Sequence, residues 1–356
     1  MTRGKRAGDG RAKLISLATA VPANVLRQEE VTQQAAALFG SRRADLERLL
    51  PIFKNTGIDT RYSVETLEWF HRKQGWPERT AAYLNGATEL FVRAAEDALA
   101  QARVAAAEID TVVTVSSTGI ATPSLEARAH ARMGFRDDVR RVPVFGLGCA
   151  GGVTGLSLAA RLAAASPGDR VLLVAVELCT LSFREDETTK ANIVATALFG
   201  DGAAAAVVTS RGEDGLAEVE ASGEHLWPDT LEVMGWRIDP VGFSAIFSRS
   251  IPDLVTEKLR PATEAFLARH KLALDDIVHH VFHPGGARVV DALETVFRLP
   301  QGALNKEREV LRDYGNMSAP TVLFVLKQAL LSGLPGRSLV AALGPGFTGS
   351  FLTLAA

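Results

Sequence analysis

A cysteine and a histidine have the side chains of a covalent catalyst, and each lies at the end of a predicted strand. Cys149 lies in residues 148–152, Gly-Cys-Ala-Gly-Gly, where an apolar strand runs into an apolar helix. The positive end of a helix dipole lowers the pKa of a thiol and favours the nucleophilic thiolate. The flanking glycines let the chain turn tightly and let a substrate approach. A buried cysteine that only fills space is the alternative interpretation.

A thiol nucleophile needs a basic partner, and the chain has seven histidines. In residues 279–283, strand alternation puts His279 and His283 on one face and His280 on the other. Pro-Gly-Gly follows His283, which ends the strand and leaves this side chain at the edge of the sheet. No nearby Cys or carboxylate completes a ligand set, so we expect no metal site. The histidines that we expect to be ordinary surface or packing residues are His71, His130, His225 and His270.

The third candidate group is an amide. Asn316 lies in residues 314–320, Tyr-Gly-Asn-Met-Ser-Ala-Pro, where a turn enters an apolar helix. Its side chain could donate to a developing oxyanion, or it could cap the helix, and the sequence leaves both interpretations open. Cys149 and Asn316 each follow a glycine and each begin an apolar helix, one in each half of the chain. This parallel suggests an internal duplication with the active site between the halves.

The elements that must position these residues alternate between strand and helix. The spacing of apolar residues predicts a first strand from residue 14, and further strands at 111–115, 142–145, 170–176, 203–209, 277–282, 338–343 and 350–354. Helices are predicted at 87–103, 152–165, 252–270, 287–297 and 318–331. This alternation predicts a layered α/β fold. Residues 210–214 mark a seam between an N-terminal half, 14–212, and a C-terminal half, 213–356, of one compact unit.

The composition excludes several classes of protein. The 356 residues are 47% hydrophobic and 22% charged, a composition typical of a soluble globular protein. The net charge of −2 excludes a nucleic-acid binder that relies on a strong basic field. Two cysteines are too few for a disulfide scaffold and suit the cytoplasm. Residues 142–160 and 338–356 carry no charge, but glycines interrupt both, so we expect no integral membrane span.

The N-terminus is basic. We interpret residues 1–13 as a mobile basic tail before the first strand, in preference to a signal peptide, because Ser16 and Thr19 interrupt the short apolar stretch that follows. A nucleic-acid arm is disfavoured because no aromatic residue is interleaved with the charges.

Taken together, the motifs resemble the type III polyketide synthases of the chalcone-synthase superfamily, which have the thiolase fold. The resemblance runs from about residue 14 to the C-terminus. The segments that carry it are 20–24, 116–119, 148–152, 177–184, 197–204, 283–286, 315–318 and 344–347. It implies an αβαβα arrangement of layers, two pseudo-symmetric halves and a homodimer.

By this resemblance, Cys149 receives the starter acyl group from acyl-CoA and holds the growing chain as a thioester. His283 is expected to pair with Cys149 as an imidazolium, and His283 and Asn316 to bind the thioester carbonyl of malonyl-CoA while carbon dioxide leaves. Phe199 matches the family's gatekeeper aromatic, although plain core packing would explain it too. No metal or organic cofactor is implied, because the CoA thioesters are substrates. The other expected substrate-binding residues are Ser117, Thr118, Thr122, Glu177, Cys179, Ser182, Ala245, Ser318, Gly344, Gly346 and Phe347.

Departures from the plant members bear on the substrate. Ala245 aligns with a second gatekeeper Phe, Cys179 with a Thr, and Thr122 with a Met that crosses the dimer interface. Smaller side chains open volume, and similar bacterial members have a tunnel for long acyl chains. We therefore expect a medium- or long-chain fatty acyl-CoA starter, repeated extension with malonyl-CoA, and release as an alkylpyrone or alkylresorcinol. The cations available for the CoA phosphates are Arg42, Arg43, Arg48 and Lys54.

Two other functions remain open. A ketoacyl synthase III, which takes its substrate from an acyl-carrier protein, shares the Cys-His-Asn set but lacks the segments 283–286 and 344–347. A catalytically inactive thiolase-fold scaffold is the alternative from another class of protein. A degradative thiolase is excluded, because it needs a second catalytic cysteine late in the chain and no cysteine follows Cys179.

Overall fold

The computed structural model describes residues 11–40, 49–212 and 214–356. Nine strands form one mixed sheet. In spatial order they are β11 (His279–Phe282), β12 (Arg337–Gly344), β13 (Thr348–Ala355), β8 (Ala217–Leu226), β1 (Lys13–Ala20), β7 (Asp201–Thr209), β6 (Arg170–Leu178), β4 (Thr111–Val115) and β5 (Arg140–Val144). Pairing is parallel between β11 and β12, β4 and β6, and β4 and β5, and antiparallel elsewhere.

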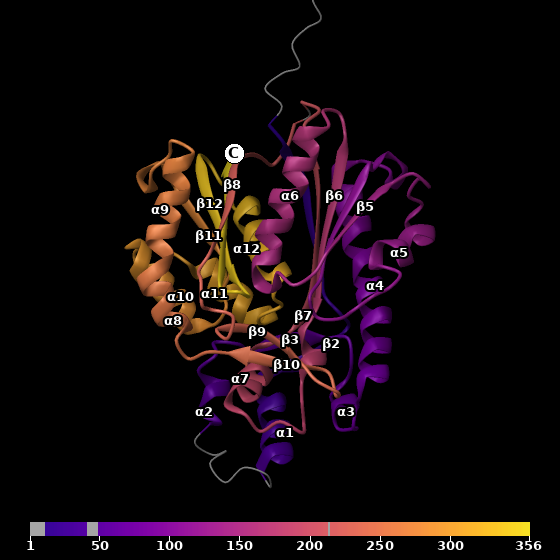
Figure 1. The fold of residues 1–356 in the computed structure, drawn as a ribbon, viewed down its shortest axis with the longest axis vertical. Coiled ribbons are helices and arrows are strands. Elements are labelled where there is room, and N and C mark those ends of the chain that lie inside the picture. The colour runs from indigo at the N-terminus through magenta and orange to yellow at the C-terminus, as the bar shows by residue number, and fades with distance from the viewer. Residues whose placement is uncertain (1–10, 41–48, 213) are drawn as a thin grey trace, which may run out of the picture.

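The sheet consists of two sets of strands that meet at a short seam. β1 pairs with β7 along its length, from Lys13 opposite Thr209 to Ala20 opposite Ala203. With β8 it pairs only at Lys13 and Leu14. The first set therefore runs from β1 to β5 and the second from β8 to β11, and the two sets diverge away from this seam (Figure 1).

Helices complete five layers, αβαβα, as Figure 1 shows. The outer face of the first set is covered by α4 (Trp76–Ala102) and α5 (Leu125–Met133). Between the two sets lie α6 (Gly151–Ala165) and α12 (Ala319–Leu331). The outer face of the second set is covered by α9 (Arg260–Arg269) and α10 (Ala287–Phe297). The layered thiolase fold predicted from the sequence is confirmed, with two pseudo-symmetric halves whose central helices are α6 and α12.

Burial on both faces explains the sequences of the central strands. β7 reads Asp-Gly-Ala-Ala-Ala-Ala-Val-Val-Thr and is buried at every position. α4 packs on one face of this strand and the central helices on the other, so apolar residues do not alternate with polar ones. At Gly152, in the first turn of α6, an added Cβ would lie 2.2 Å from the carbonyl oxygen of Ala319. Glycine is therefore required where α6 and α12 cross.

The remaining elements form a cap at one end of the layers, at the bottom of Figure 1. None of them was predicted from the sequence. They are β2 (Asn24–Arg27), α1 (Gln28–Gly40), α2 (Pro51–Lys54), β3 (Thr60–Ser63), α3 (Leu67–Phe70), α7 (Lys190–Leu198), β9 (Met234–Ile238) and β10 (Phe243–Phe247). α11 (Asn305–Tyr314), also not predicted, packs beside α12.

Most predicted elements appear with shifted ends, and three expectations need correction. The helix predicted at 252–270 consists of α8 (Ile251–Leu254), a π-helical turn (Val255–Leu259) and α9, whose Pro261 has no N–H to continue the hydrogen-bond ladder. The helix predicted at 87–103 is the second part of α4. Residues 1–10 of the predicted tail lie outside the described residues, whereas residues 11–13 are ordered: Arg11 pairs with Glu218, and β1 begins at Lys13.

Candidate active site

Cys149 lies in a short 3-10 turn (Gly148–Ala150) at the start of α6. Gly148 has φ +48°, and an added Cβ would lie 2.6 Å from Pro345. An added Cβ at Gly344 would lie 2.5 Å from the carbonyl oxygen of Leu147. The segment 344–346 therefore packs directly behind the cysteine turn, and Gly344 allows this close approach.

A buried carboxyl group supports the same turn. The Ser117 hydroxyl accepts hydrogen bonds from the backbone N–H groups of Gly146, at 3.0 Å, and Gly148, at 3.2 Å. The backbone N–H of Ser117 and the hydroxyl of Thr118 donate to Glu177, which has no exposed surface. Burial raises the pKa of Glu177 to about 8, although these hydrogen bonds oppose the shift. Ser117, Thr118 and Glu177 thus hold the cysteine turn from behind and line none of the three cavities described below.

Asn316 faces Cys149 with a fixed amide orientation. Its Oδ1 accepts from the backbone N–H of Ser318 at 2.8 Å and lies 4.0 Å from the Cys149 Sγ. Its Nδ2 donates to the carbonyl of Gly285 at 3.2 Å, which leaves the second amide hydrogen available to a substrate. The residue before the first turn of α12 is Ser318, so Asn316 does not cap that helix. The structure thus favours the catalytic interpretation of Asn316 over helix capping.

Burial shifts the pKa values of both other groups. It raises the pKa of the Cys149 thiol to about 11, opposed by hydrogen bonds with Ser318 and Asn316. It lowers the pKa of His283 to about 4, and neither ring nitrogen of His283 has a hydrogen-bond partner among the described residues. Both shifts favour the uncharged thiol and imidazole. Burial acts on each group separately, and the imidazolium–thiolate pair expected from the resemblance stays a prediction.

One cavity brings the three groups together. Cys149, His283 and Asn316 line the same space of about 530 Å³, and its other walls are almost entirely apolar. The further lining residues are Met234, Phe247, Ile251, Leu259, Phe282, Gly285, Val289, Leu293, Ala341, Ala342 and Leu343. We call this space the catalytic cavity. Apolar walls and a few converging polar groups are typical of a site for a small organic substrate.

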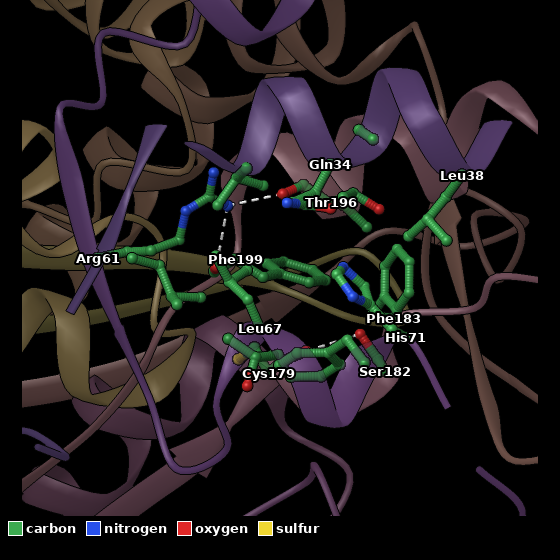
Figure 2. Close-up of a pocket in the computed structure, with 16 residues that line it drawn as sticks. Gln34, Leu38, Arg61, Leu67, His71, Cys179, Ser182, Phe183, Thr196 and Phe199 are labelled. Carbon is green, nitrogen blue, oxygen red and sulfur yellow. Dashed lines mark hydrogen bonds between the residues drawn. The ribbon is translucent and has the colours of Figure 1, made fainter. Parts of the chain in front are cut away.

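A second apolar space, of about 570 Å³ counted to its open mouth, has Phe199 in its wall (Figure 2), and we call it the apolar channel. Three predicted residues line it: Cys179, Ser182 and Phe199. α1, α3 and the loop before α7 supply lining residues that the sequence analysis missed, among them Val31, Ala35, Leu38, Leu67, His71 and Phe183. The helical spacing of Val31, Ala35 and Leu38 is a signal that could have identified one wall. His71 is exposed, so the channel reaches the surface.

A third space, which we call the cationic mouth, adjoins the catalytic cavity. The two spaces share Phe247, Ile251, Gly285 and Val289 as lining residues. Three cations line the mouth, Lys190, Arg249 and Arg288. None of the three forms an ion pair with another described residue. Of the cations expected here, Arg42, Arg43 and Arg48 lie outside the described residues, and Lys54 is exposed on α2 without lining the mouth.

The other predicted positions lie at varying distances from the chemistry. Ala245 is buried against Phe199 and Cys179 in one apolar cluster, but Trp236 and Phe247 belong to it too, so the small side chain does not by itself open space there. Ser318 lies beside Cys149 and Asn316. Gly346 accepts from the Thr230 hydroxyl, and Phe347 is core packing against Trp227, so neither lines the catalytic cavity. Thr122 is exposed on this single chain.

The described ranges contain neither a candidate metal site nor a helix that could span a membrane. No group of three or more His, Cys, Asp or Glu side chains there could hold a metal ion. Within the same ranges, no helix is long and apolar enough to cross a membrane.

Two duplicated α/β halves with a cysteine, a histidine and an asparagine at their junction define a thiolase-like protein with a cysteine-centred site. The family model for the N-terminal domain of chalcone and stilbene synthases matches residues 1–212, and the model for their C-terminal domain matches residues 218–349. The chain belongs to the chalcone and stilbene synthase family, the type III polyketide synthases. These enzymes are acyltransferases that condense malonyl-CoA, with loss of carbon dioxide, onto an acyl-CoA starter.

Individual relatives agree with this assignment. The chain is 39% identical over 345 residues to a 1,3,6,8-tetrahydroxynaphthalene synthase of Streptomyces peucetius subsp. caesius, covering 94% of this chain and 91% of the relative. The fold also matches a crystal structure, that of the 1,3,6,8-tetrahydroxynaphthalene synthase of Streptomyces coelicolor A3(2), which is a bacterial type III polyketide synthase. The TM-score is 0.91 and the sequence identity 30%, and the match covers 96% of this chain and 99% of that one. The type III domain of Steely1 from Dictyostelium matches with a TM-score of 0.91 and 26% identity, over 97% and 99%.

Proposed function

We propose that this polyketide synthase loads a medium- or long-chain fatty acyl group on Cys149, extends it with malonyl-CoA and releases an alkylpyrone or alkylresorcinol. The apolar channel carries this proposal. It begins at Phe199 and Cys179 beside the catalytic residues, and its walls are aliphatic and aromatic side chains with few polar atoms (Figure 2). Such a space stabilises an alkyl chain by removing its surface from water, at about 25 cal/mol per Å².

The geometry supports a role for each catalytic group. The Cys149 thiol attacks the thioester carbonyl of the starter, and its proton passes to the neutral ring of His283. That proton then leaves with CoA, which departs as the free thiol. When malonyl-CoA loses carbon dioxide, the free amide hydrogen of Asn316 and the ring N–H of His283 donate to the enolate oxygen. The enolate carbon attacks the Cys149 thioester, a carbon–carbon bond forms, and Cys149 leaves as a thiolate that regains a proton from solvent.

The cationic mouth fits the anionic end of CoA. Lys190, Arg249 and Arg288 come from α7, the segment after β10, and α10, and they line the space that adjoins the catalytic cavity. Since no carboxylate among the described residues neutralises them, they would pair with phosphate groups. We propose that they, and not the cations expected from the sequence, hold the phosphates while the pantetheine arm reaches Cys149. Because CoA thioesters are the substrates, we propose no metal or organic cofactor.

The relatives favour a second candidate. Both 1,3,6,8-tetrahydroxynaphthalene synthases match this chain over more than nine-tenths of its length. The second candidate is therefore a synthase that makes tetrahydroxynaphthalene. Tetrahydroxynaphthalene carries no alkyl chain. We therefore propose that such a synthase would be primed by a short starter such as malonyl-CoA. The apolar channel would then hold the growing polyketide in place of an alkyl tail.

We also propose a cytoplasmic homodimer. β5 lies at the edge of the sheet, and Phe145, which directly follows it, is more than half exposed in the single chain. Ile120, in the loop after the neighbouring strand β4, is also more than half exposed. Apolar side chains next to an open sheet edge support an interface between two copies of the chain. Both cysteines are free, which suits a reducing compartment.

Product analysis by mass spectrometry tests the proposal. The purified protein would be incubated with malonyl-CoA alone and with starters from acetyl-CoA to an 18-carbon acyl-CoA, beside a Cys149→Ala control. Pyrones or resorcinols made preferentially from long starters, and absent from the control, would support the fatty acyl starter. Products from malonyl-CoA alone, with no use of long starters, would favour the second candidate. Condensation only with acyl groups bound to a carrier protein would support the ketoacyl synthase alternative.

A further inference from the structure

The imidazole ring of His283 has no hydrogen bond to hold it. Both of its nitrogens are buried, and neither has a partner among the described residues. The orientation of the ring therefore depends on packing and on the backbone that carries it. His283 directly follows β11, and its backbone N–H donates to the carbonyl of Ala341 in β12 at 3.0 Å. Contacts that fix the end of β11 therefore also fix the position of the imidazole.

A buried carboxyl group contacts the other side of this strand end. β11 is an edge strand of the sheet and pairs only with β12 among the described strands. Because successive N–H groups of a strand point to opposite sides, the N–H of Phe282 points away from β12. It donates to Oε1 of Glu307 at 2.9 Å. Glu307 thus satisfies a backbone group at the open edge of the sheet, in the residue before His283.

The helix that carries Glu307 also leads to Asn316. Glu307 lies in the first turn of α11 and is almost fully buried. α11 ends at Tyr314, two residues before Asn316, whose amide donates to the carbonyl of Gly285 at 3.2 Å. The backbone on both sides of His283 is therefore hydrogen-bonded to one continuous segment, α11 and the turn that follows it.

The carboxyl group of Glu307 can accept this hydrogen bond in either protonation state. Burial raises its pKa to about 7, and hydrogen bonds from the backbone N–H groups of Phe282 and of Glu307 itself oppose the shift. A carboxylate has two acceptor oxygens, and a carboxylic acid keeps a carbonyl oxygen that accepts. The contact with Phe282 therefore requires the length of this side chain and an oxygen at its end, and not the charge.

We infer that Glu307 is a positioning residue for His283: by accepting from Phe282 it holds the end of β11 where the imidazole can take the proton of Cys149. The inference rests on the proposed function, which gives His283 that role. Glu307 lines neither the catalytic cavity nor the apolar channel nor the cationic mouth, so it acts through the backbone of β11 and not on a substrate.

The rate at which iodoacetamide alkylates Cys149 at pH 8, followed by peptide mass spectrometry, tests this inference without a CoA substrate. Glu307→Gln keeps the length of the side chain and an acceptor oxygen, whereas Glu307→Asp keeps the charge but is one methylene shorter. We expect Glu307→Asp to slow the alkylation roughly tenfold, because general-base assistance contributes about 10²–10⁴-fold and a displaced ring loses part of it. Glu307→Gln should stay within about twofold of the wild type, because it retains the acceptor.

Two controls separate positioning from stability. Glu294→Asp is the matched control, since Glu294 is a buried carboxyl group of α10 that accepts from the backbone N–H groups of Gly302 and Leu304. We expect it to lower the free energy of unfolding but to leave the alkylation rate within about twofold of the wild type, because its contacts do not involve β11. The second control places Glu307→Asp in a His283→Ala background, where no imidazole remains to be positioned and the rate should change by less than about twofold.

The outcomes separate the positioning role from the proposed function. If Glu307→Asp reacts as fast as the wild type, or Glu307→Gln as slowly as Glu307→Asp, the positioning role is overturned and the role of His283 stands. If Glu294→Asp slows the reaction as much, or Glu307→Asp slows it equally in the His283→Ala background, the effect is not exerted through His283 and the inference is also overturned. If His283→Ala alone reacts at the wild-type rate, the role proposed for His283 falls and the inference falls with it.

Discussion

Ser318 has a backbone conformation that normally belongs to glycine, and it lies beside Cys149. Its φ of +58° and ψ of −129° are strained for a residue with a Cβ. At the same time its hydroxyl lowers the pKa of Cys149, against the larger effect of burial. The strain and the hydroxyl therefore act on different properties, stability and thiol reactivity, which substitution can separate.

We predict that Ser318→Gly is more stable than Ser318→Ala, because only glycine relieves the positive φ. The difference in the free energy of unfolding should be about 1 kcal/mol, measured by denaturant titration. Both variants lose the hydroxyl, so both should react more slowly than the wild type with iodoacetamide at pH 8. Equal stability of the two variants would contradict the strain at this position.

Glu177 predicts a dependence of stability on pH. Burial raises its pKa to about 8, so the folded protein keeps a proton that the unfolded chain releases near its ordinary pKa of 4.5. The stabilisation is complete below pH 4.5 and is lost as the pH rises towards 8. Asp201 and Glu307, whose pKa values burial raises to about 7, act in the same direction, whereas the buried His283 acts in the opposite one.

Several buried groups affect the pH dependence of stability, so the contribution of Glu177 is obtained by comparing the unfolding free energies of the wild type and Glu177→Gln. We predict that unfolding free energies measured between pH 5 and 8.5 decrease with pH more steeply for the wild type than for the variant. Parallel curves would show that Glu177 titrates as it does in the unfolded chain.

The proposed catalytic residues were the part of the site most open to prediction, for a local reason. Cys149 and His283 each follow a strand, and Asn316 lies in the turn between α11 and α12. All three lie in short segments that contain glycine, and such segments are visible in one chain. The contacts of Phe247 and Trp236 with Phe199 were missed because they depend on the pairing of β9 with β10. A comparison of aligned positions singled out Ala245 and could not detect that a ring from position 247 lies beside Phe199.

At the scale of elements, prediction succeeded where both faces of a strand are buried or a helix has a regular apolar stripe. The strand predicted at 111–115 matches β4, and the helix predicted at 287–297 matches α10. The elements of the cap were missed because most are short and mix polar with apolar residues. β2, β3 and α2 have four residues each. These elements nonetheless build the channel, since α1 and α3 supply one side of it.

The cationic mouth gives a prediction at this scale, because its charges come from α7, α10 and the segment after β10. Each charge-assisted contact to a phosphate at such a surface contributes about 1 kcal/mol. We predict that Arg249→Ala/Arg288→Ala raises the KM for malonyl-CoA roughly thirtyfold, with little change in kcat. Steady-state kinetics would measure this beside Arg27→Ala, which removes an exposed cation that does not line the mouth. An unchanged KM would show that CoA binds elsewhere.

For the whole molecule, the duplication explains why residues far apart in sequence meet at one point. α6 and α12 both end near the seam of the two sets of strands and begin at the opposite end of the layers, towards the cap. α6 follows the turn that carries Cys149, and α12 follows Asn316. His283 follows β11, on the second set, and its backbone N–H donates to the carbonyl of Ala341 in the neighbouring β12. The sequence suggested this arrangement, because the two Gly-containing helix starts are parallel features of the two halves.

The proposed dimer also belongs to this scale. Burial of a Phe side chain contributes about 1.5–3 kcal/mol, and an unpaired Asp in its place would add a desolvation cost. We therefore predict that light scattering during size exclusion gives a dimer for the wild type and a monomer for Phe145→Asp. Leu331→Asp is the matched control, since Leu331 is a highly exposed apolar residue at the end of α12. A dimer that survives Phe145→Asp would exclude an interface at β5.

The measurement that tests the central claim most directly is the starter profile of Cys179→Phe. Cys179 is fully buried and lines the channel next to Phe199, so a ring at this position would block the channel and leave the catalytic cavity open. The fatty acyl account predicts that products from palmitoyl-CoA fall at least tenfold relative to the wild type, while products from acetyl-CoA or malonyl-CoA alone persist. Palmitoyl products that persist in the variant, or an equal loss with every starter, would contradict it.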